Sequence, residues 1–162
     1  MQTKPGFLSA SADQTLHLAP ELWQPAVRAH LLAGEILLAT IETDLDEQLQ
    51  FAHGLICLTN QRLCALSPAG AWSEWPLSAD QTLKLTDHAG IATLDLLTPS
   101  ARLNRWRFTL AQNPAALRLV RQLDSLRQNE KDRQRTEAGE AVPAQGTGDE
   151  PALCPNCWVP LP

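Results

Sequence analysis

The chain has 162 residues and carries 13 Lys plus Arg against 18 Asp plus Glu, which gives a formal charge of -5 at neutral pH. This length suits one domain of ordinary size with an appendage, and it excludes a large multidomain enzyme. The net negative charge also disfavours nonspecific binding to the phosphate backbone of a nucleic acid, so no nucleic-acid partner is expected.

The four cysteines fall into two dissimilar pairs, which is not the pattern of a secreted disulfide framework. The first residues lack the apolar core of a signal peptide, and no stretch approaches the roughly 18 apolar residues of a membrane span. These observations predict a cytoplasmic location.

The first predicted element is a short helix over residues 24–32. Its spacing places Val27 and Leu31 on one side, together with Trp23. Pro25 fits only in the first turn of such a helix, where its missing N–H costs no hydrogen bond.

Seven short runs with period-2 alternation follow this helix and predict strands. They are residues 36–42, 49–58, 62–67, 72–77, 82–86, 91–97 and 102–110. Turn residues separate neighbouring runs and leave no room for crossover helices, which excludes a parallel sheet. The pattern therefore predicts an antiparallel meander.

The last predicted strand leads into a second amphipathic helix. Asn113 is expected to cap its N-terminus, and Pro114 to occupy its first helical position. Its apolar stripe consists of Leu117, Val120, Leu123 and Leu126. Burial of this stripe would plug the open end of a curled sheet, which removes an exposed edge and completes the core.

Composition changes sharply near residue 128. Between residues 128 and 151 the only aliphatic side chain larger than alanine is Val142, so this stretch cannot offset the entropy of ordering itself. It is predicted to start as helix and to be disordered after Gly139. The predicted organisation is an N-terminal extension at 1–19, a domain at 20–127, a flexible linker at 128–151 and the start of a zinc-ribbon-like segment at 152–162.

Four short matches carry a family resemblance. They are Gly34-Glu35, Gly54, Leu58-Thr59 and Arg62-Leu63. On these residues the chain resembles bacterial PH-like or GRAM-like domains, which pair a Gly-Glu before the first strand with a G-x-x-x-L-T-x-x-R-L hairpin. The resemblance implies a mainly β fold, a seven-stranded bent antiparallel barrel capped by a C-terminal amphipathic α-helix.

A wider pattern adds a narrower resemblance. It consists of DLDEQ at 44–48, FAHG at 51–54, LTNQR at 58–62, W-x-x-W-P-L at 72–77, DHAG at 87–90 and RWRFT at 105–109. These segments resemble the N-terminal region of ABC exporters associated with cyanophycin metabolism, where a PH-like domain precedes a CPxC zinc ribbon, membrane-spanning helices and an ATPase. The resemblance implies a fragment at the cytoplasmic face of the inner membrane that acts with downstream transporter domains.

The residues themselves carry no signature of ATP hydrolysis. A G-x-x-x-x-G-K-[ST] loop is absent, since none of Lys4, Lys84 and Lys131 follows a glycine. The predicted function is therefore a non-catalytic interaction or regulatory module rather than an enzyme. A stand-alone protein-binding domain and a membrane-surface adaptor are the alternatives.

The hairpin around residues 60 and 61 makes specific pairings testable. A two-residue loop would place Leu58 opposite Leu63 and Cys57 opposite Cys64, with Asn60 in the positive-φ conformation that such loops require. The two cysteines are read as small buried side chains in preference to a cross-strand disulfide. Gly54 predicts a bulge or sharp bend nearby.

Cys154 and Cys157 form a C-P-N-C knuckle, which can present two thiolates to one zinc ion. A structural zinc site needs four ligands, so this pair supplies half of a site. The open alternatives are a tail without metal and a redox pair. Zinc is the only cofactor that the sequence suggests.

Four arginines form a candidate interaction surface: Arg62, Arg102, Arg105 and Arg107. Arg62 is also expected to be structural, with its head group on a nearby carboxylate or carbonyl. The three arginines at 102, 105 and 107 could pair with Asp95 or Glu74 on neighbouring strands, or form a patch for an anion or a protein. Trp106 and Phe108 alternate with these arginines and are expected in the core.

An acidic turn formed by Asp44, Asp46 and Glu47 follows the first predicted strand. These carboxylates could chelate a hard cation, although a solvated turn is preferred because the sequence lacks the glycine and distal glutamate of an EF-hand loop. Lipid-binding PH domains carry basic residues at this place. The acids disfavour phosphoinositide binding and favour a protein partner.

Overall fold

The computed structural model describes residues 14–139. The elements are η1 (Leu16–Leu18), η2 (Glu21–Trp23), α2 (Gln24–His30), β1 (Leu37–Leu45), β2 (Phe51–Thr59), β3 (Arg62–Leu66), β4 (Trp72–Pro76), β5 (Thr82–His88), β6 (Ile91–Leu97), β7 (Arg102–Thr109), η3 (Leu110–Gln112) and α3 (Asn113–Glu137). The predicted zinc ligands Cys154 and Cys157 and half of the predicted linker lie outside the described residues.

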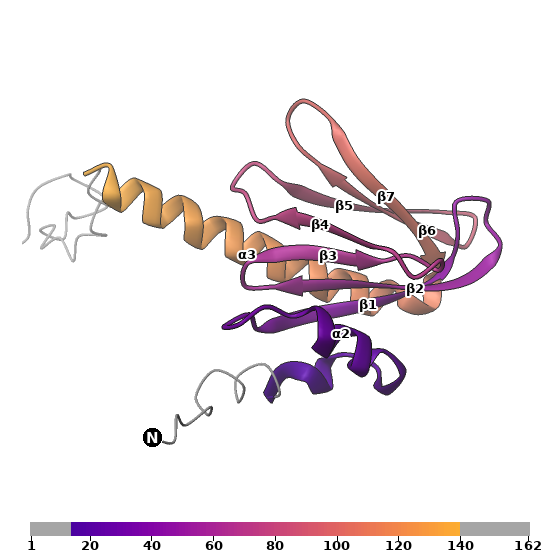
Figure 1. The fold of residues 1–162 in the computed structure, drawn as a ribbon. Helices are drawn as coiled ribbons and strands as arrows, with labels where there is room; N and C mark the ends of the chain where they lie inside the picture. Colours follow the sequence, from indigo (N-terminus) through magenta and orange to yellow (C-terminus); the bar gives the residue numbers. More distant parts are fainter. Residues whose placement is uncertain (1–13, 140–162) are drawn as a thin grey trace, which may run out of the picture. The chain divides into compact units, whose positions relative to one another are not determined.

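All seven strands form one antiparallel sheet in the order β4-β3-β2-β1-β7-β6-β5. β1 joins the two halves of the sheet: it pairs with β2 along its length and with β7 where Leu45 faces Arg107. The sheet bends at this junction (Figure 1). β4 and β5 are both edge strands, so the sheet is bent but not closed. The predicted mainly β fold with seven antiparallel strands and a C-terminal helix is confirmed.

β1 is longer than predicted. It continues past Asp44, where the sequence predicted a turn, because the Asp44 carboxylate accepts hydrogen bonds from the backbone N–H and the hydroxyl of Thr109. The turn begins instead at Asp46. Its Oδ1 accepts hydrogen bonds of 2.9 Å from the backbone N–H groups of Gln48 and Gln50.

The interior core lies between the bent sheet and α3. It consists of Ala39, Ile41, Ile56, Leu58, Leu63, Ala65, Leu83, Ala92, Leu94, Leu96, Phe108, Ala116, Leu119 and Leu123. Side chains from both halves of the sheet meet here because successive strand residues alternate between its faces. Each leucine buried in this way stabilises the fold by about 1.5–3 kcal/mol.

The helix face that enters this core differs in part from the predicted stripe. The buried α3 residues are Ala116, Leu119 and Leu123, with Val120 and Leu126 partly buried beside them. Leu117 is 43% exposed, so its place in the stripe was predicted wrongly. It lies about 100° around the helix from Ala116, whose small side chain lets the helix come close to the sheet.

The start of α3 also differs from the prediction. Asn113 is already helical, with φ of -58°, and its Oδ1 is buried without a hydrogen-bond partner, so it does not act as the N-cap. The η3 turn leads directly into the helix and leaves no extended residue at position 113. Pro114 consequently occupies the second helical position, where a missing N–H still costs nothing.

A second hydrophobic cluster covers the opposite face of the β1–β3 half of the sheet. Its buried residues are Leu16, Ala19, Val27, Leu37, Leu55, Cys57, Cys64 and Leu66, with Trp23, Ala26, Leu31 and Trp72 packed against them. The predicted apolar side of the first helix is confirmed, since Val27 is buried here. Residues 16 and 19, which the sequence assigned to the extension, are part of this cluster.

α3 continues to Glu137, and Gly139 follows in the left-handed region with φ of +76°. The compact unit that holds the sheet ends at Lys131. Among residues 14–139, no helix combines the length and the apolar character that crossing a membrane requires.

Candidate functional site

The two motifs of the family resemblance meet in one buried ion pair. Glu35 lies in the loop before β1, and Arg62 is the first residue of β3. Arg62 Nε lies 2.8 Å from Glu35 Oε1, and Nη2 lies 3.0 Å from Oε2, which is the bidentate geometry of a strong charge-assisted contact. Glu35 is 0% exposed and Arg62 is 7% exposed.

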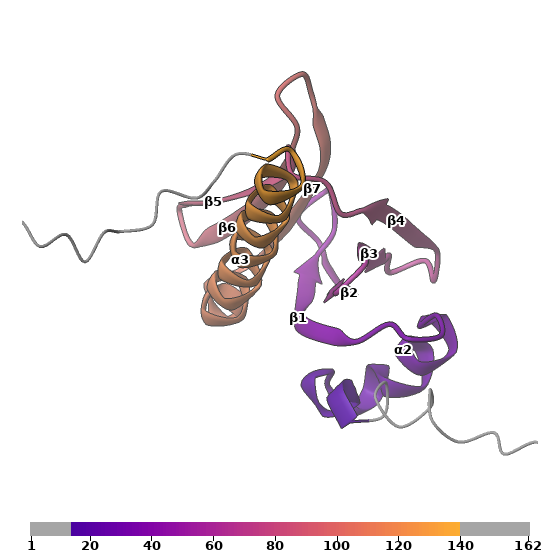
Figure 2. The same cartoon turned by 90° about the vertical axis from the view of Figure 1, so that its left-hand side faces the viewer.

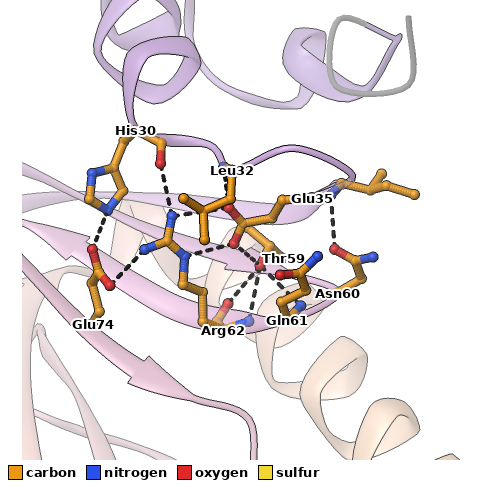
Figure 3. A network of polar contacts seen from close by, with 9 residues as sticks. His30, Leu32, Glu35, Thr59, Asn60, Gln61, Arg62 and Glu74 are labelled. Atoms are coloured by element: carbon orange, nitrogen blue, oxygen red, sulfur yellow. Dashed lines mark hydrogen bonds and ion pairs between the residues drawn. The ribbon is translucent and has the colours of Figure 1, made fainter. Parts of the chain in front are cut away.

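Both carboxylate oxygens of Glu35 have a second donor. The hydroxyl of Thr59 donates to Oε1 at 2.6 Å, and the backbone N–H of Leu32 donates to Oε2 at 2.8 Å (Figure 3). A buried carboxylate is tolerated only when such donors replace the water that it lost. Glu35 therefore joins the loop after α2 to β2 and β3 at one point.

The guanidinium of Arg62 has further acceptors. Nη2 donates to the carbonyl oxygen of His30 at 2.8 Å, and Nη1 lies 2.7 Å from Glu74 Oε2 on β4. The His30 ring stacks on Trp72 with a centroid distance of 4.0 Å, and its Nε2 lies 2.9 Å from Glu74 Oε1.

The electrostatics of this network favour the charged forms of both Glu35 and Arg62. Burial opposes ionisation of Glu35, but the hydrogen bonds from Arg62, Leu32 and Thr59 outweigh it and hold its pKa below the ordinary value. The hydrogen bond to Glu35 raises the pKa of Arg62. Both side chains therefore stay charged at neutral pH, and the contact is an ion pair.

The position of Arg62 decides between its two predicted roles. Its head group reaches a carboxylate and a carbonyl, as the structural interpretation predicted, and it fastens the end of α2 to the β2–β3 hairpin. Because Arg62 is buried, it does not contribute to an exposed interaction surface. The resemblance motif is thus a structural clamp of the fold.

The hairpin turn is closed differently from the prediction. Among the described residues other than glycine, positive φ occurs at Leu49 and Ala89, so Asn60 does not adopt it. The turn is held instead by the Thr59 hydroxyl, which accepts hydrogen bonds from the N–H groups of Gln61 and Arg62. The pairings Leu58–Leu63 and Cys57–Cys64 are confirmed.

Cys57 and Cys64 are free, buried thiols that face each other across β2 and β3. Burial raises the pKa of Cys57, and it raises that of Cys64 to about 12. Both thiols are therefore protonated at neutral pH and poor nucleophiles. The interpretation of two small buried side chains is confirmed.

Gly54 marks a close approach of strands. A Cβ at this position would lie 2.6 Å from Thr43 Oγ1 and 2.8 Å from the Leu66 carbonyl oxygen. The β1–β2 register shifts just beyond this pair, between Thr43 and Leu45. The predicted irregularity lies here, and glycine is required because no side chain fits.

The other three arginines of the predicted surface line one hollow of about 920 Å³. Its walls are Thr43 and residues 45–48 of β1 and the following turn, residues 65–69 and Ser73 around the β3–β4 turn, and residues 102–107 of β7. Arg107 Nη1 donates to the Glu47 carbonyl oxygen at 2.9 Å and so links two of these walls. The sequence grouped these three arginines with Arg62, which does not line the hollow, and it did not predict the other walls, because they come from distant turns.

Arg105 pairs with Asp95, one of the two carboxylates that the sequence offered to the arginines of this strand. Its Nε lies 2.6 Å from Oδ1 and its Nη2 lies 3.0 Å from Oδ2. The hydrogen bond from Arg105 lowers the pKa of Asp95, against a smaller opposing effect of burial. Trp106 and Phe108 turn toward the interior, as predicted: Phe108 is buried and Trp106 meets Trp75 edge-on at 5.5 Å.

Apolar side chains lie exposed at and beside this hollow. Leu103 on β7 is 41% exposed, and the β1–β2 connection and the start of β2 present Leu49 and Phe51, which are 45% and 85% exposed. Leu49 is also held at a positive φ of 61°. Sequence alone assigned these residues to a strand, and only their exposure identifies them as available for contact.

Residues 14–139 contain no group of three or more His, Cys, Asp or Glu side chains that could hold a metal ion. Asp44 and Asp46 of the acidic turn are occupied by the hydrogen bonds described above. The predicted half zinc site at Cys154 and Cys157 lies outside these residues.

The fold and the two sites define a small antiparallel β domain with a clamped N-terminal segment and an arginine-lined hollow. No family model matches the chain, and no curated protein matches it either.

Proposed function

We propose that residues 20–127 form a non-catalytic PH-like interaction module that docks a protein partner in the arginine-lined hollow. The observation that carries this proposal is the composition of the hollow, where three arginines, an exposed leucine and an acidic turn surround one cavity of about 920 Å³. Apolar contact area bounded by charges of both signs is typical of a protein interface.

The charges of the hollow support a protein ligand over a phosphoinositide. Asp46 and Glu47 line the same cavity as Arg102 and Arg107. A lipid phosphate would meet repulsion from these carboxylates, whereas a protein surface with complementary acids and bases would not. The net charge of -5 further weakens attraction to an anionic membrane.

The partner that the sequence resemblance suggests is a transporter. On the segments described above, we propose that the module is the N-terminal cytoplasmic part of a bacterial ABC exporter, with Cys154 and Cys157 as the first half of a zinc ribbon. Residues encoded beyond Pro162 would then contain a second CxxC, spanning helices and a P-loop.

Site-specific photocrosslinking in bacterial cells tests the docking role. Benzoylphenylalanine placed at Leu103 is expected to give one discrete adduct with a transporter polypeptide, identified by mass spectrometry. The same probe at Lys84, an exposed residue of β5 outside the hollow, is the matched control and is expected to give none. The charge reversal R107E should abolish the Leu103 adduct.

Two results would overturn the proposal. One is an equal adduct at Leu103 and Lys84, which would show nonspecific contact. The other is flotation of the purified chain with vesicles containing anionic lipid, sensitive to salt and lost in R107E. That result would favour the membrane-surface adaptor instead.

A further inference from the structure

A second hollow, separate from the arginine-lined one, runs between β1 and α3 and measures about 580 Å³. α3 and β1 lie beside each other in the domain (Figure 2). The third wall is the N-terminal segment at Leu18, whose carbonyl oxygen accepts a 2.6 Å hydrogen bond from the Thr40 hydroxyl. We call this hollow the β1–α3 groove.

The groove meets β1 at its edge and not at one of its faces. Leu38, Ala39 and Thr40 are consecutive residues, and all three line the groove. Because consecutive strand side chains point to opposite faces, a cavity that touches all three must follow the strand edge.

That edge carries no neighbouring strand along most of its length. Opposite its pairing with β2, the described part of β1 pairs with β7 only where Leu45 faces Arg107. A β-strand edge with unpaired backbone groups is a template for a further strand. The groove therefore offers backbone pairing in addition to side-chain contacts.

The helical wall of the groove is basic. Arg118 and Arg121 lie one turn apart on α3, line the groove and are exposed. Within residues 14–139, no carboxylate forms an ion pair with either arginine. The acid of the opposite wall, Glu42, already accepts a 3.1 Å hydrogen bond from Trp23 Nε1.

We propose that the β1–α3 groove binds an extended, acidic segment of a partner protein, which adds as a strand to the edge of β1. Residues 38–42 of β1 span about 16 Å, and residues 112–125 of α3 span about 20 Å, so both walls match an extended segment of about five residues. Backbone pairing with β1 holds the segment, and acidic side chains reach Arg118 and Arg121.

This inference extends the proposed function, because it gives the interaction module a second contact surface with its own ligand chemistry. It does not depend on occupancy of the arginine-lined hollow. The two surfaces are distinguished by variants that alter one and leave the other intact.

Fluorescence anisotropy with a defined peptide tests the groove on the full chain. The probe is a fluorescein-labelled peptide of about eight residues in which glutamate alternates with valine, a length that exceeds the groove. We expect saturable, salt-sensitive binding. A peptide with lysine in place of glutamate should not bind.

Charge reversals locate the site. The double variant R118E/R121E should weaken binding about tenfold or more, because attraction becomes repulsion. K131E, a single charge reversal on an exposed residue of α3 outside the groove, should bind like the wild type. These residues are exposed, so all variants should fold, and circular dichroism checks that they do.

Hydrogen exchange distinguishes strand addition from simple charge attraction. Bound peptide should slow exchange of backbone amides within residues 38–42, and a peptide with alternate valines replaced by proline should lose most of its affinity. Absence of binding by the wild type, equal weakening in K131E, or unchanged exchange along β1 would overturn the proposal. Loss of binding in R107E but not in R118E/R121E would place the peptide in the other hollow, which overturns the groove and leaves the proposed function standing.

Discussion

The Arg62–Glu35 and Arg105–Asp95 pairs have almost the same geometry and very different surroundings. Both are bidentate, with shorter contacts of 2.8 Å and 2.6 Å and longer contacts of 3.0 Å in each. The side chains of the first pair are 9% and 0% exposed, whereas those of the second are 38% and 11% exposed.

The difference in exposure gives the two pairs different roles. Arg62–Glu35 is a buried structural clamp, and Arg105–Asp95 is a contact that solvent reaches at its arginine. Water reaches the Arg105 head group when the Arg105–Asp95 pair opens, so breaking this pair lowers the free energy of unfolding only a little. Neither Arg62 nor Glu35 can regain water without separating the N-terminal segment from the hairpin. The Arg62–Glu35 pair thus holds three elements together, whereas the Arg105–Asp95 pair only links two neighbouring strands.

The largest expected effect comes from removing one partner of the buried pair. R62A leaves the Glu35 carboxylate buried without its ion-pair partner, which should lower the free energy of unfolding by about 3–5 kcal/mol. Urea denaturation measured by tryptophan fluorescence gives this value. R62K keeps the positive charge but cannot make the bidentate contact of a guanidinium, so it should recover only part of the lost stability. A loss as small as that of a surface pair would contradict the clamp.

The second-largest effect is expected from acid, which should lower the stability of the fold by protonating Glu35. Its folded pKa lies below the ordinary 4.5, so its stabilisation is present above that pH and is lost as pH falls through the folded pKa. Urea midpoints of the wild type should therefore drop as pH falls below about 5. E35Q should be less stable than the wild type at neutral pH and should show a shallower drop. Parallel curves for the two proteins would exclude Glu35 as the cause.

Thr59 tests whether the hydroxyl belongs to the clamp. T59V removes a donor to Glu35 and the acceptor that closes the hairpin turn, with little change in shape. The expected loss is about 1–3 kcal/mol for buried groups left unpaired. T59S keeps the hydroxyl and should remain close to the wild type in the same denaturation experiment. Equal losses in both variants would point to packing instead.

The smallest effect is expected at the Arg105–Asp95 pair, whose arginine is open to solvent although Asp95 itself is buried. D95N should destabilise the domain less than any variant above, and added salt should shrink the difference further, because solvent screens this contact. Thermal melts at low and high salt measure this. A loss that matches R62A and resists salt would remove the distinction between the two pairs.

Local patterns in the sequence predicted much of the fold. Alternation of apolar residues located all seven strands, because a strand with a buried face must repeat with period 2. The predicted two-residue hairpin loop correctly placed Cys57 opposite Cys64. Strand ends were less accurate, as Asp44 shows, because its bond to Thr109 joins residues 65 positions apart.

The candidate sites were predicted less completely. The sequence proposed a nearby carboxylate for Arg62 but could not identify Glu35, Glu74 and the His30 carbonyl as its partners. It also placed Leu117 on the buried side of α3, because spacing gives the period of a helix and not its rotation against the sheet. The β1–α3 groove left no signal in the sequence at all.

The sequence by itself determined the order and kind of the elements, since hydrophobic period and turn residues act over a few positions. The tertiary structure decided which arginine is buried, which face of α3 meets the core and which edge of β1 stays open. Those outcomes depend on contacts between residues far apart in the chain. Burial also sets how much a given ion pair stabilises the fold, and no local pattern reveals it.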